Sequence, residues 1–293
     1  MAVDTILFGD CRTTLKSLEE KPRMCVTSPP YYGLRDYGGE ASQIGQEQTP
    51  EEYIQSLVEV FRSVREVLAD DGTLWVNIGD SYYNYRPGKG QSYPKQSVSK
   101  TKQDLPEQCN KRGNKLEGLK EKDLIGIPWM LAFALRSDGW YLRQDIIWHK
   151  PNPMPESVRD RCTKSHEYIF LFSKNRKYYY DNEAIKEPVK QDWGTRNRTN
   201  GKYHNEGTGL QPHSGLTKSY TTKNKRSVWT VTNKPYKGAH FAVYPPDLIE
   251  PCIKAGSEEG DIVLDPFMGS GTTALVAKSL QRHYIGCELH EDY

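Results

Sequence analysis

The 293-residue sequence has only six cysteines, and their spacing follows no regular pattern. No two of them form a Cys-x-x-Cys pair, so we expect neither a zinc site, nor any other metal centre, nor a disulfide framework. No apolar run approaches the length of a membrane span, and no charged-then-apolar leader stands at the start. These absences predict a reducing, cytoplasmic setting and no membrane partner.

Net charge is also nearly absent, at +2, but its distribution is uneven. Residues 84–122 hold ten Lys or Arg against four Asp or Glu, and residues 186–237 hold eleven against three. The remainder of the chain therefore carries a net charge of −12. Two basic segments on a mildly acidic body are typical of a nucleic-acid-binding protein, although solvated lysine-rich loops would give the same count.

A glycine-rich turn lies within residues 261–273, which read DIVLDPFMGSGTT, but the lysine of a phosphate-binding loop is missing from it. The consecutive apolar residues Ile262–Leu264 predict a strand that is buried on both faces. Gly269 and Gly271 allow the backbone to approach a ligand closely, and Thr272 stands where it could cap the next helix. This strand, turn and helix predict a ligand site that does not bind phosphate.

Two acidic residues indicate which ligand class this site prefers. Asp265 at the glycine turn would repel a phosphate and attract an amine. Glu288 ends a second predicted strand, residues 282–287, and an acid in that place commonly binds ribose hydroxyls. S-adenosylmethionine has a ribose, an ammonium and a sulfonium but no phosphate, so these residues favour it over NAD.

A second motif, TSPPY at residues 27–31, follows a short β-favouring run, Met24–Thr27. The two prolines end the strand and hold an extended loop. The carbonyls of Ser28 and Pro29 can then accept hydrogen bonds from a planar amino-bearing group, and the Tyr31 ring offers a surface for stacking. A Pro-Pro turn with an incidental tyrosine is the alternative interpretation.

Together and in this order, TSPPY and DPFMGSGTT resemble the motifs of the β-group of amino-methylating DNA methyltransferases, in which the catalytic motif precedes the cofactor motif. The resemblance covers most of the chain. Further stretches that carry it are residues 8–10, 72–80, 147–151, 166–170 and 240–249. It implies an α/β, Rossmann-like S-adenosylmethionine-dependent methyltransferase fold with circularly permuted motif order and a mostly parallel sheet, for which we count seven strands.

The resemblance also implies two sets of site residues. The catalytic set is Ser28, Pro29, Pro30 and Tyr31. The cofactor-binding set is Asp10, Asp265, Pro266, Phe267, Gly269, Gly271, Thr272 and Glu288. The family places the acid at position 10 near the adenine amino group of the cofactor, whereas the sequence by itself equally allows a plain helix N-cap there.

Composition divides the chain into a predicted domain and two inserts. Residues 1–83, 124–182 and 238–293 form the catalytic and cofactor-binding domain, 84–123 a basic flexible insert, and 183–237 the target-recognition region, for which a disordered basic loop is the alternative. We expect double-stranded DNA to contact basic residues of both inserts. They are Arg196, Arg198, Lys218, Lys223, Lys225, Arg226, Lys100 and Lys102.

We expect the strands that end at Thr27 and Asp265 to be neighbours, because ligands of parallel sheets bind at the carboxyl ends of the strands. The methyl donor would then lie beside the Ser28 loop. The target base would be flipped out of the duplex and held against Tyr31. Family members with Ser before Pro-Pro mostly methylate N4 of cytosine, which is therefore our prediction. N6 of adenine is the alternative, and an RNA or protein amide is a more distant one.

A cognate restriction endonuclease is a candidate partner, and we expect a monomer or a homodimer.

Overall fold

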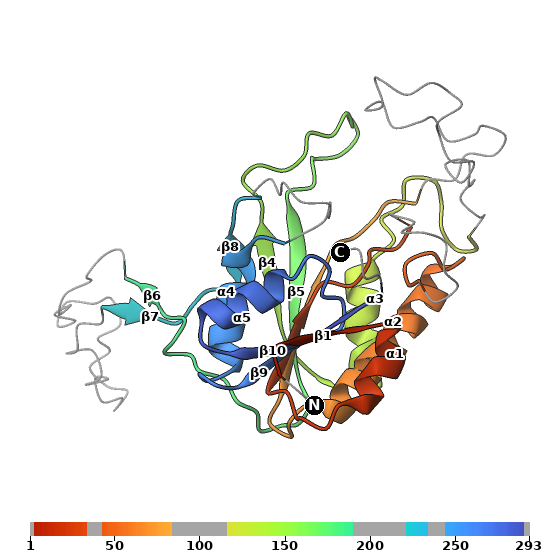
Figure 1. Ribbon diagram of the computed structural model, residues 1–293. Helices are drawn as coiled ribbons and strands as arrows, with labels where there is room; N and C mark the ends of the chain where they lie inside the picture. The colour runs from red at the N-terminus through yellow and green to blue at the C-terminus, as the bar shows by residue number, and fades with distance from the viewer. Residues whose placement is uncertain (1–2, 34–42, 84–115, 190–220, 234–243, 290–293) are drawn as a thin grey trace, which may run out of the picture.

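The structure is a computed structural model that describes residues 3–33, 43–83, 116–189, 221–233 and 244–289 (Figure 1). Its centre is an eight-stranded sheet with the order β1-β10-β9-β2-β3-β5-β4-β8. The sheet strands are β1 Thr5–Phe8, β2 Met24–Thr27, β3 Thr73–Ile78, β4 Tyr141–His149, β5 His166–Ser173, β8 Val228–Thr230, β9 Ile262–Asp265 and β10 His283–Glu288. A separate two-stranded sheet consists of β6 Glu187–Pro188 and β7 Thr222–Lys223.

Most neighbouring strands of the large sheet pair in parallel, as the sequence predicted. β1, β10, β9, β2 and β3 form one parallel block. β5 runs antiparallel to both β3 and β4, and β8 pairs in parallel with β4. The start of β5 therefore lies at the same edge of the sheet as the carboxyl ends of the parallel strands.

The sheet has one strand more than the seven predicted. The additional strand, β8, pairs with the end of β4 from Ile147 and Val228 to His149 and Thr230. Trp229 anchors it, because this side chain is buried against the sheet. A three-residue strand within a basic segment has no periodicity by which the sequence could reveal it. The division of the chain into a domain and two inserts stays a prediction, since most of both inserts lies outside the described residues.

Helices cover both faces of the sheet, as Figure 1 shows. The helices are α1 Cys11–Thr14, α2 Pro50–Val67, α3 Ile127–Ser137, α4 Pro246–Gly256 and α5 Thr272–Ser279, and a 3-10 turn, Leu15–Ser17, follows α1. α1, α2 and α3 pack on one face and α4 and α5 on the other. Successive strand residues alternate between these layers: Leu74 faces α2, whereas Trp75 faces α4.

The start of α2 agrees with its sequence signals. Thr49 accepts a hydrogen bond from the Glu52 amide, the Glu52 side chain caps the Thr49 amide, and Pro50 occupies the first turn. α3 begins at Ile127, directly after Gly126, which takes a left-handed conformation (φ 89°) at the N-cap. No helix among these described ranges is long and apolar enough to cross a membrane.

Candidate active site

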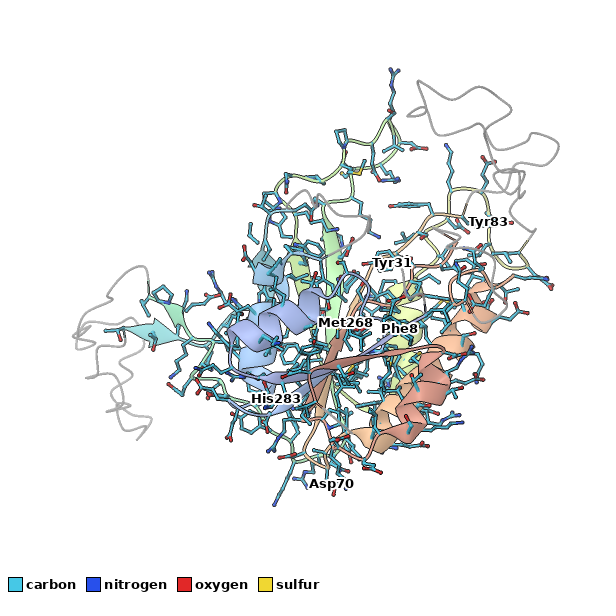
Figure 2. All side chains as sticks on the ribbon, in the orientation of Figure 1. Phe8, Tyr31, Asp70, Tyr83, Met268 and His283 are labelled. Atoms are coloured by element: carbon cyan, nitrogen blue, oxygen red, sulfur yellow. The ribbon has the colours of Figure 1, made fainter. Side chains whose placement is uncertain are left out.

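The two sequence motifs meet at the junction of β2 and β9. These strands pair in parallel, with Cys25 opposite Leu264, so that Thr27 and Asp265 end side by side. This confirms the predicted adjacency. Figure 2 shows Asp70 at the bottom of the view, with Met268 and Phe8 near its centre and Tyr31 above them.

Asp265 joins the two motifs through its carboxylate, each oxygen of which accepts two hydrogen bonds. Its Oδ1 accepts hydrogen bonds from Thr27 Oγ1 (2.5 Å) and the Phe267 amide (3.0 Å). Its Oδ2 accepts from Tyr244 OH (3.1 Å) and from Thr273 Oγ1. The residue is only 1% exposed, and burial raises its pKa to about 6 although the four hydrogen bonds lower it. Asp265 therefore connects the loop after β2 with the glycine turn through hydrogen bonds, and its carboxylate is not exposed to bind an amine directly.

The glycine turn after β9 needs its glycines for backbone reasons. Gly269 and Gly271 have φ values of 52° and 83°, which residues other than glycine rarely adopt. Gly271 is the N-cap of α5, which begins at Thr272, and no side chain caps this helix. The expectation that Thr272 caps this helix is therefore wrong, because the left-handed turn moves the cap position to the glycine.

Glu288, the last residue of β10, accepts hydrogen bonds from the loops that follow β9 and β1. Its Oε2 accepts a hydrogen bond from the Gly269 amide (2.7 Å), and its backbone carbonyl accepts from the Gly9 amide (2.8 Å). Beside it, Met268 packs so closely on Gly286 that a Cβ there would lie 2.4 Å from the Met268 Cε. The turn of β9 therefore sits directly over the end of β10.

Asp10 follows β1 at the same edge and caps α1. Its Oδ1 accepts from the Arg12 amide (2.9 Å), and the Arg12 guanidinium forms an ion pair with its carboxylate (2.6 Å). The helix-capping role is confirmed. A contact between Asp10 and an adenine amino group stays a prediction.

Ser270 is a residue that the predicted site set lacks. Its Oγ is buried but has no hydrogen-bond partner within the described part of the chain. A buried hydroxyl without a partner is costly, so a polar ligand at the glycine turn would relieve it. Together with the glycines and Glu288, this orphaned atom fits a nucleoside-type ligand such as S-adenosylmethionine. The position of Ser270 between Gly269 and Gly271 is the sequence feature that could have identified it as a site residue.

The Tyr31 ring is held from two directions. Its hydroxyl donates to Glu167 Oε2 (2.8 Å), and Glu167 is ion-paired through Oε1 with Lys150. Asn77 Nδ2 also donates to Glu167 Oε2 (3.3 Å). The ring lies on Gly79, where a Cβ would come within 2.8 Å of Cε2. Burial, and then the charge of Glu167, raises the pKa of Tyr31 well above its usual value, so the hydroxyl stays a donor.

The Pro-Pro turn itself is fixed by α2. Tyr53 donates its hydroxyl to the Pro30 carbonyl (2.7 Å). The carbonyls of Ser28 and Pro29 accept no hydrogen bond from any described residue. Sequence reasoning missed the supporting residues Tyr53, Asn77, Lys150 and Glu167, although Asn77, Lys150 and Glu167 lie in stretches that carry the family resemblance.

Of the predicted DNA contacts, Lys223, Lys225 and Arg226 are described. Arg226 and Lys223 approach Glu187 at 3.0 and 4.0 Å, and the ammonium of Lys225 lies 4.9 Å from the Trp229 ring centroid. These cations are thus partly engaged within the protein, although Arg226 remains mostly exposed. The other predicted contacts lie outside the described residues: Arg196, Arg198, Lys218, Lys100 and Lys102.

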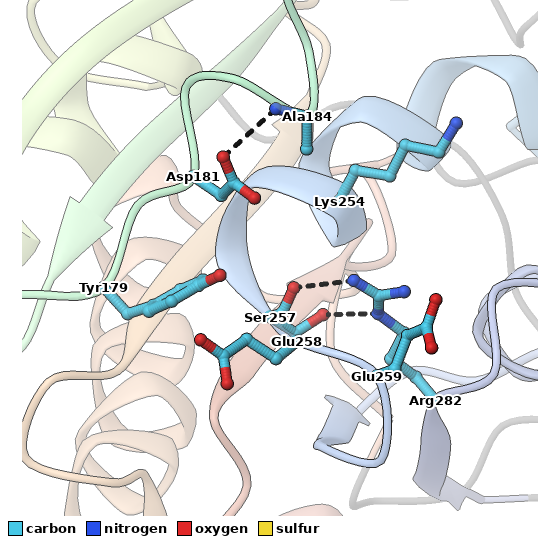
Figure 3. A pocket seen from close by; sticks show the side chains of 8 residues that line it. All are labelled: Tyr179, Asp181, Ala184, Lys254, Ser257, Glu258, Glu259 and Arg282. Atoms are coloured by element: carbon cyan, nitrogen blue, oxygen red, sulfur yellow. Dashed lines mark hydrogen bonds between the residues drawn. The ribbon is translucent and has the colours of Figure 1, made fainter.

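A hollow of about 380 Å³ lies elsewhere, at the amino-end edge of β9 and β10 (Figure 3). Arg282 fills part of its wall and donates to the carbonyls of Ser257 (2.8 Å) and Leu280 (2.6 Å). Asp181 on the opposite side accepts from the Ala184 amide (3.1 Å). The polar side chains of this hollow form hydrogen bonds with neighbouring backbone groups. The hollow lies away from the carboxyl ends of β2 and β9, where the two motifs meet.

The fold and the paired motifs define a Rossmann-like α/β protein of the methyltransferase class. The chain belongs to the N6/N4 methyltransferase family, whose model, described as DNA methylase, matches residues 23–293. It is 48% identical to the Type II methyltransferase M.SmaI of Serratia marcescens, over 98% of this chain and 87% of that protein. It is 47% identical to M.XycI of Xanthomonas campestris pv. cyanopsidis, over 99% and 84% respectively.

Solved structures agree with the fold. The PvuII DNA methyltransferase, described as cytosine-N4-specific, aligns with a TM-score of 0.63 at 18% identity and covers 100% of this chain and 84% of its own. The putative DNA modification methylase TTHA0409 of Thermus thermophilus, complexed with S-adenosyl-L-methionine, aligns with a TM-score of 0.60 at 22% identity, over 99% and 90%.

The raised pKa of Asp265 predicts a pH-dependent stability difference. The folded group titrates at about 6 and the unfolded group near 3.8, so between these values the folded protein binds more protons. The free energy of unfolding of the wild type, relative to Asp265→Asn, should therefore be greatest below about pH 4 and fall by roughly 3 kcal/mol as the pH rises through 6. Urea unfolding of both proteins between pH 4 and 7 measures this difference.

The exposed Asp70 provides the control, because Asp70→Asn removes the same charge without a buried carboxylate. If the free energies of unfolding of the wild type and of Asp265→Asn differ by the same amount at every pH, the raised pKa of Asp265 is contradicted.

Proposed function

We propose that this protein transfers a methyl group from S-adenosylmethionine to the exocyclic N4 of cytosine in duplex DNA. Membership of the DNA methylase family supports DNA methylation itself. The observation that carries the mechanism is the pairing of β2 with β9, which brings the Ser28 loop beside the glycine turn. N6 of adenine is the second candidate target, since the family includes both activities by name.

The cofactor would be held by the loops that follow β1, β9 and β10. Glu288 lies where a carboxylate can bind ribose hydroxyls, and the Ser270 hydroxyl is available to a polar group of the ligand. Pro266, Phe267 and Thr272 complete the turn, and Asp265 positions it. The bound cofactor supplies a methyl group activated by its sulfonium.

The substrate amino group would be bound by the Ser28 loop. The Ser28 hydroxyl and the Pro29 carbonyl can accept its N–H groups, and the carbonyl has no competing donor among the described residues. These acceptors favour a tetrahedral nitrogen, whose lone pair is no longer delocalised into the base. Because β2 pairs with β9, an amino group held by the Ser28 loop would lie beside the loops proposed to bind the cofactor.

Tyr31 would provide the surface on which the flipped base stacks. Its ring rests on Gly79 and its hydroxyl on Glu167, so it needs no reorganisation when the base arrives. Glu167, Lys150 and Asn77 act as positioning residues for that ring.

Two observations favour cytosine over adenine. Ser28 precedes the two prolines, as in family members that mostly modify cytosine N4. A fold relative, the PvuII enzyme, is described as cytosine-N4-specific. The Type II names of the similar proteins support a restriction endonuclease as a functional partner of this chain as well.

Substitution of Ser28 tests the role of the loop. Ser28→Ala should lower the turnover number on the order of 100-fold, because one acceptor for the amino group is lost in the transition state. The dissociation constant for S-adenosylmethionine should stay within about twofold, since Ser28 acts on the substrate side. Ser63→Ala on the outer side of α2 is the matched control. A Ser28 variant with weakened cofactor binding and unchanged turnover would reverse the assignment.

The target atom is decided by nucleoside mass spectrometry of DNA from cells that express the protein. We expect N4-methylcytosine above the level in cells that express a Ser28→Ala control. N6-methyladenine without N4-methylcytosine would support the adenine alternative. The absence of both modified bases would contradict DNA as the substrate.

A further inference from the structure

The loop between β4 and β5, residues 150–165, projects beyond the edge of the sheet that carries the two motifs (Figure 1). Near its start lies the sequence Pro153-Met154-Pro155. The Met154 side chain is 73% exposed, more than any other large apolar side chain in the ranges that the structure describes. A single exposed apolar residue is ordinary on a protein surface, so its support and surroundings must decide whether it has a role.

The base of this loop is fixed on both sides. The Lys150 amide donates to the Ser165 carbonyl (2.7 Å), which closes the loop at its root. Asn152 and Asn233 exchange two hydrogen bonds of 3.1 and 3.0 Å, which attach the loop to the segment after β8. Because the prolines on either side of Met154 also restrict the backbone, the methionine is held out on a stiff support.

The returning half of the loop is attached as well. Arg161 donates to Glu156 (2.6 Å), and its guanidinium lies 3.8 Å from the centroid of the Tyr82 ring. Lys164 Nζ donates to the Asp80 carbonyl (2.9 Å) just after the end of β3. The loop is therefore a built projection rather than a loose connection.

The charge of the loop suits a polyanion. It holds four basic residues and two acidic ones. Both acids are neutralised within the protein, Glu156 by Arg161 and Asp160 by Lys122 (2.6 Å). Arg159 is exposed next to them. Lys150, Arg161 and Lys164 are engaged within the protein, which leaves Arg159 as the exposed cation of the loop. An exposed apolar side chain on the same loop as this arginine fits nucleic acid, because a phosphate would meet the cation and stacked bases would meet the apolar side chain.

The loop is also coupled to the base-binding ring. Its first residue, Lys150, pairs with Glu167, and Glu167 accepts the hydroxyl of Tyr31. Met154 follows Lys150 by four residues, a span of at most about 14 Å when extended. Met154 is therefore connected to the Tyr31 ring through a short stretch of backbone and two side-chain contacts, Lys150 with Glu167 and Glu167 with Tyr31.

From this arrangement we propose that Met154 is a wedge that enters the base stack of the DNA and occupies the gap left by the flipped target base. The inference rests on the proposed function, because it needs duplex DNA and a base taken out of the helix. Apolar wedges between base steps are a recurrent device of proteins that distort DNA, and a flexible thioether can fill an irregular gap.

The test uses the full chain and two duplexes that carry the methylated sequence, one with the target base paired and one with it opposite an abasic site. Met154→Ala should lower kcat/KM on the paired duplex about 10- to 100-fold, because the wedge no longer stabilises the open stack. On the second duplex, where the base is already unpaired, the loss should be less than about threefold. Met154→Leu should retain most activity on both.

Tyr141→Ala provides the control, since Tyr141 is 46% exposed at the other end of β4. An equal loss on both duplexes, or none on either, in an otherwise active enzyme would overturn the wedge and leave the proposed function standing. A wild-type protein that methylates neither duplex would contradict the proposed function, and the wedge with it.

Discussion

The buried carboxylate of Asp265 is the interaction on which the site depends. An ionised group this deep in a protein is costly, and here four donors offset part of that cost, which leaves the pKa of the carboxyl at about 6. The donors come from the end of β2, the turn after β9, the start of α5 and the segment before α4. The same four bonds that stabilise the charge therefore join the Ser28 loop to the glycine turn.

The direction of β5 explains how the second half of the site is assembled. In a fully parallel sheet only the last residues of each strand reach the ligand edge. Because β5 runs antiparallel to β3 and β4, its second residue, Glu167, lies at that edge instead. It meets Lys150 from the end of β4 and Tyr31 from the loop after β2 there. Two strands of opposite direction thus orient one aromatic ring.

Sequence patterns predicted the features that depend on local chemistry. The apolar run Ile262–Leu264 and the two prolines after Ser28 fixed the ends of two strands, and parallel pairing then made their adjacency predictable. What escaped prediction depends on contacts between distant segments. The four donors around Asp265 come from residues 27 to 273, and Tyr31 and Glu167 are separated by 136 positions. The short strand β8 escaped because its burial depends on β4 and not on its own pattern.

The most direct test of this account is the single-turnover rate of methyl transfer by Thr27→Val at saturating DNA and cofactor. Valine keeps the shape of threonine and removes only the hydrogen bond to Asp265. The account predicts a folded protein whose rate falls by at least about tenfold, because a lost bond to a buried charge lets the two loops shift relative to each other. A folded variant with the wild-type rate would contradict the claim that this bond aligns the cofactor turn with the Ser28 loop.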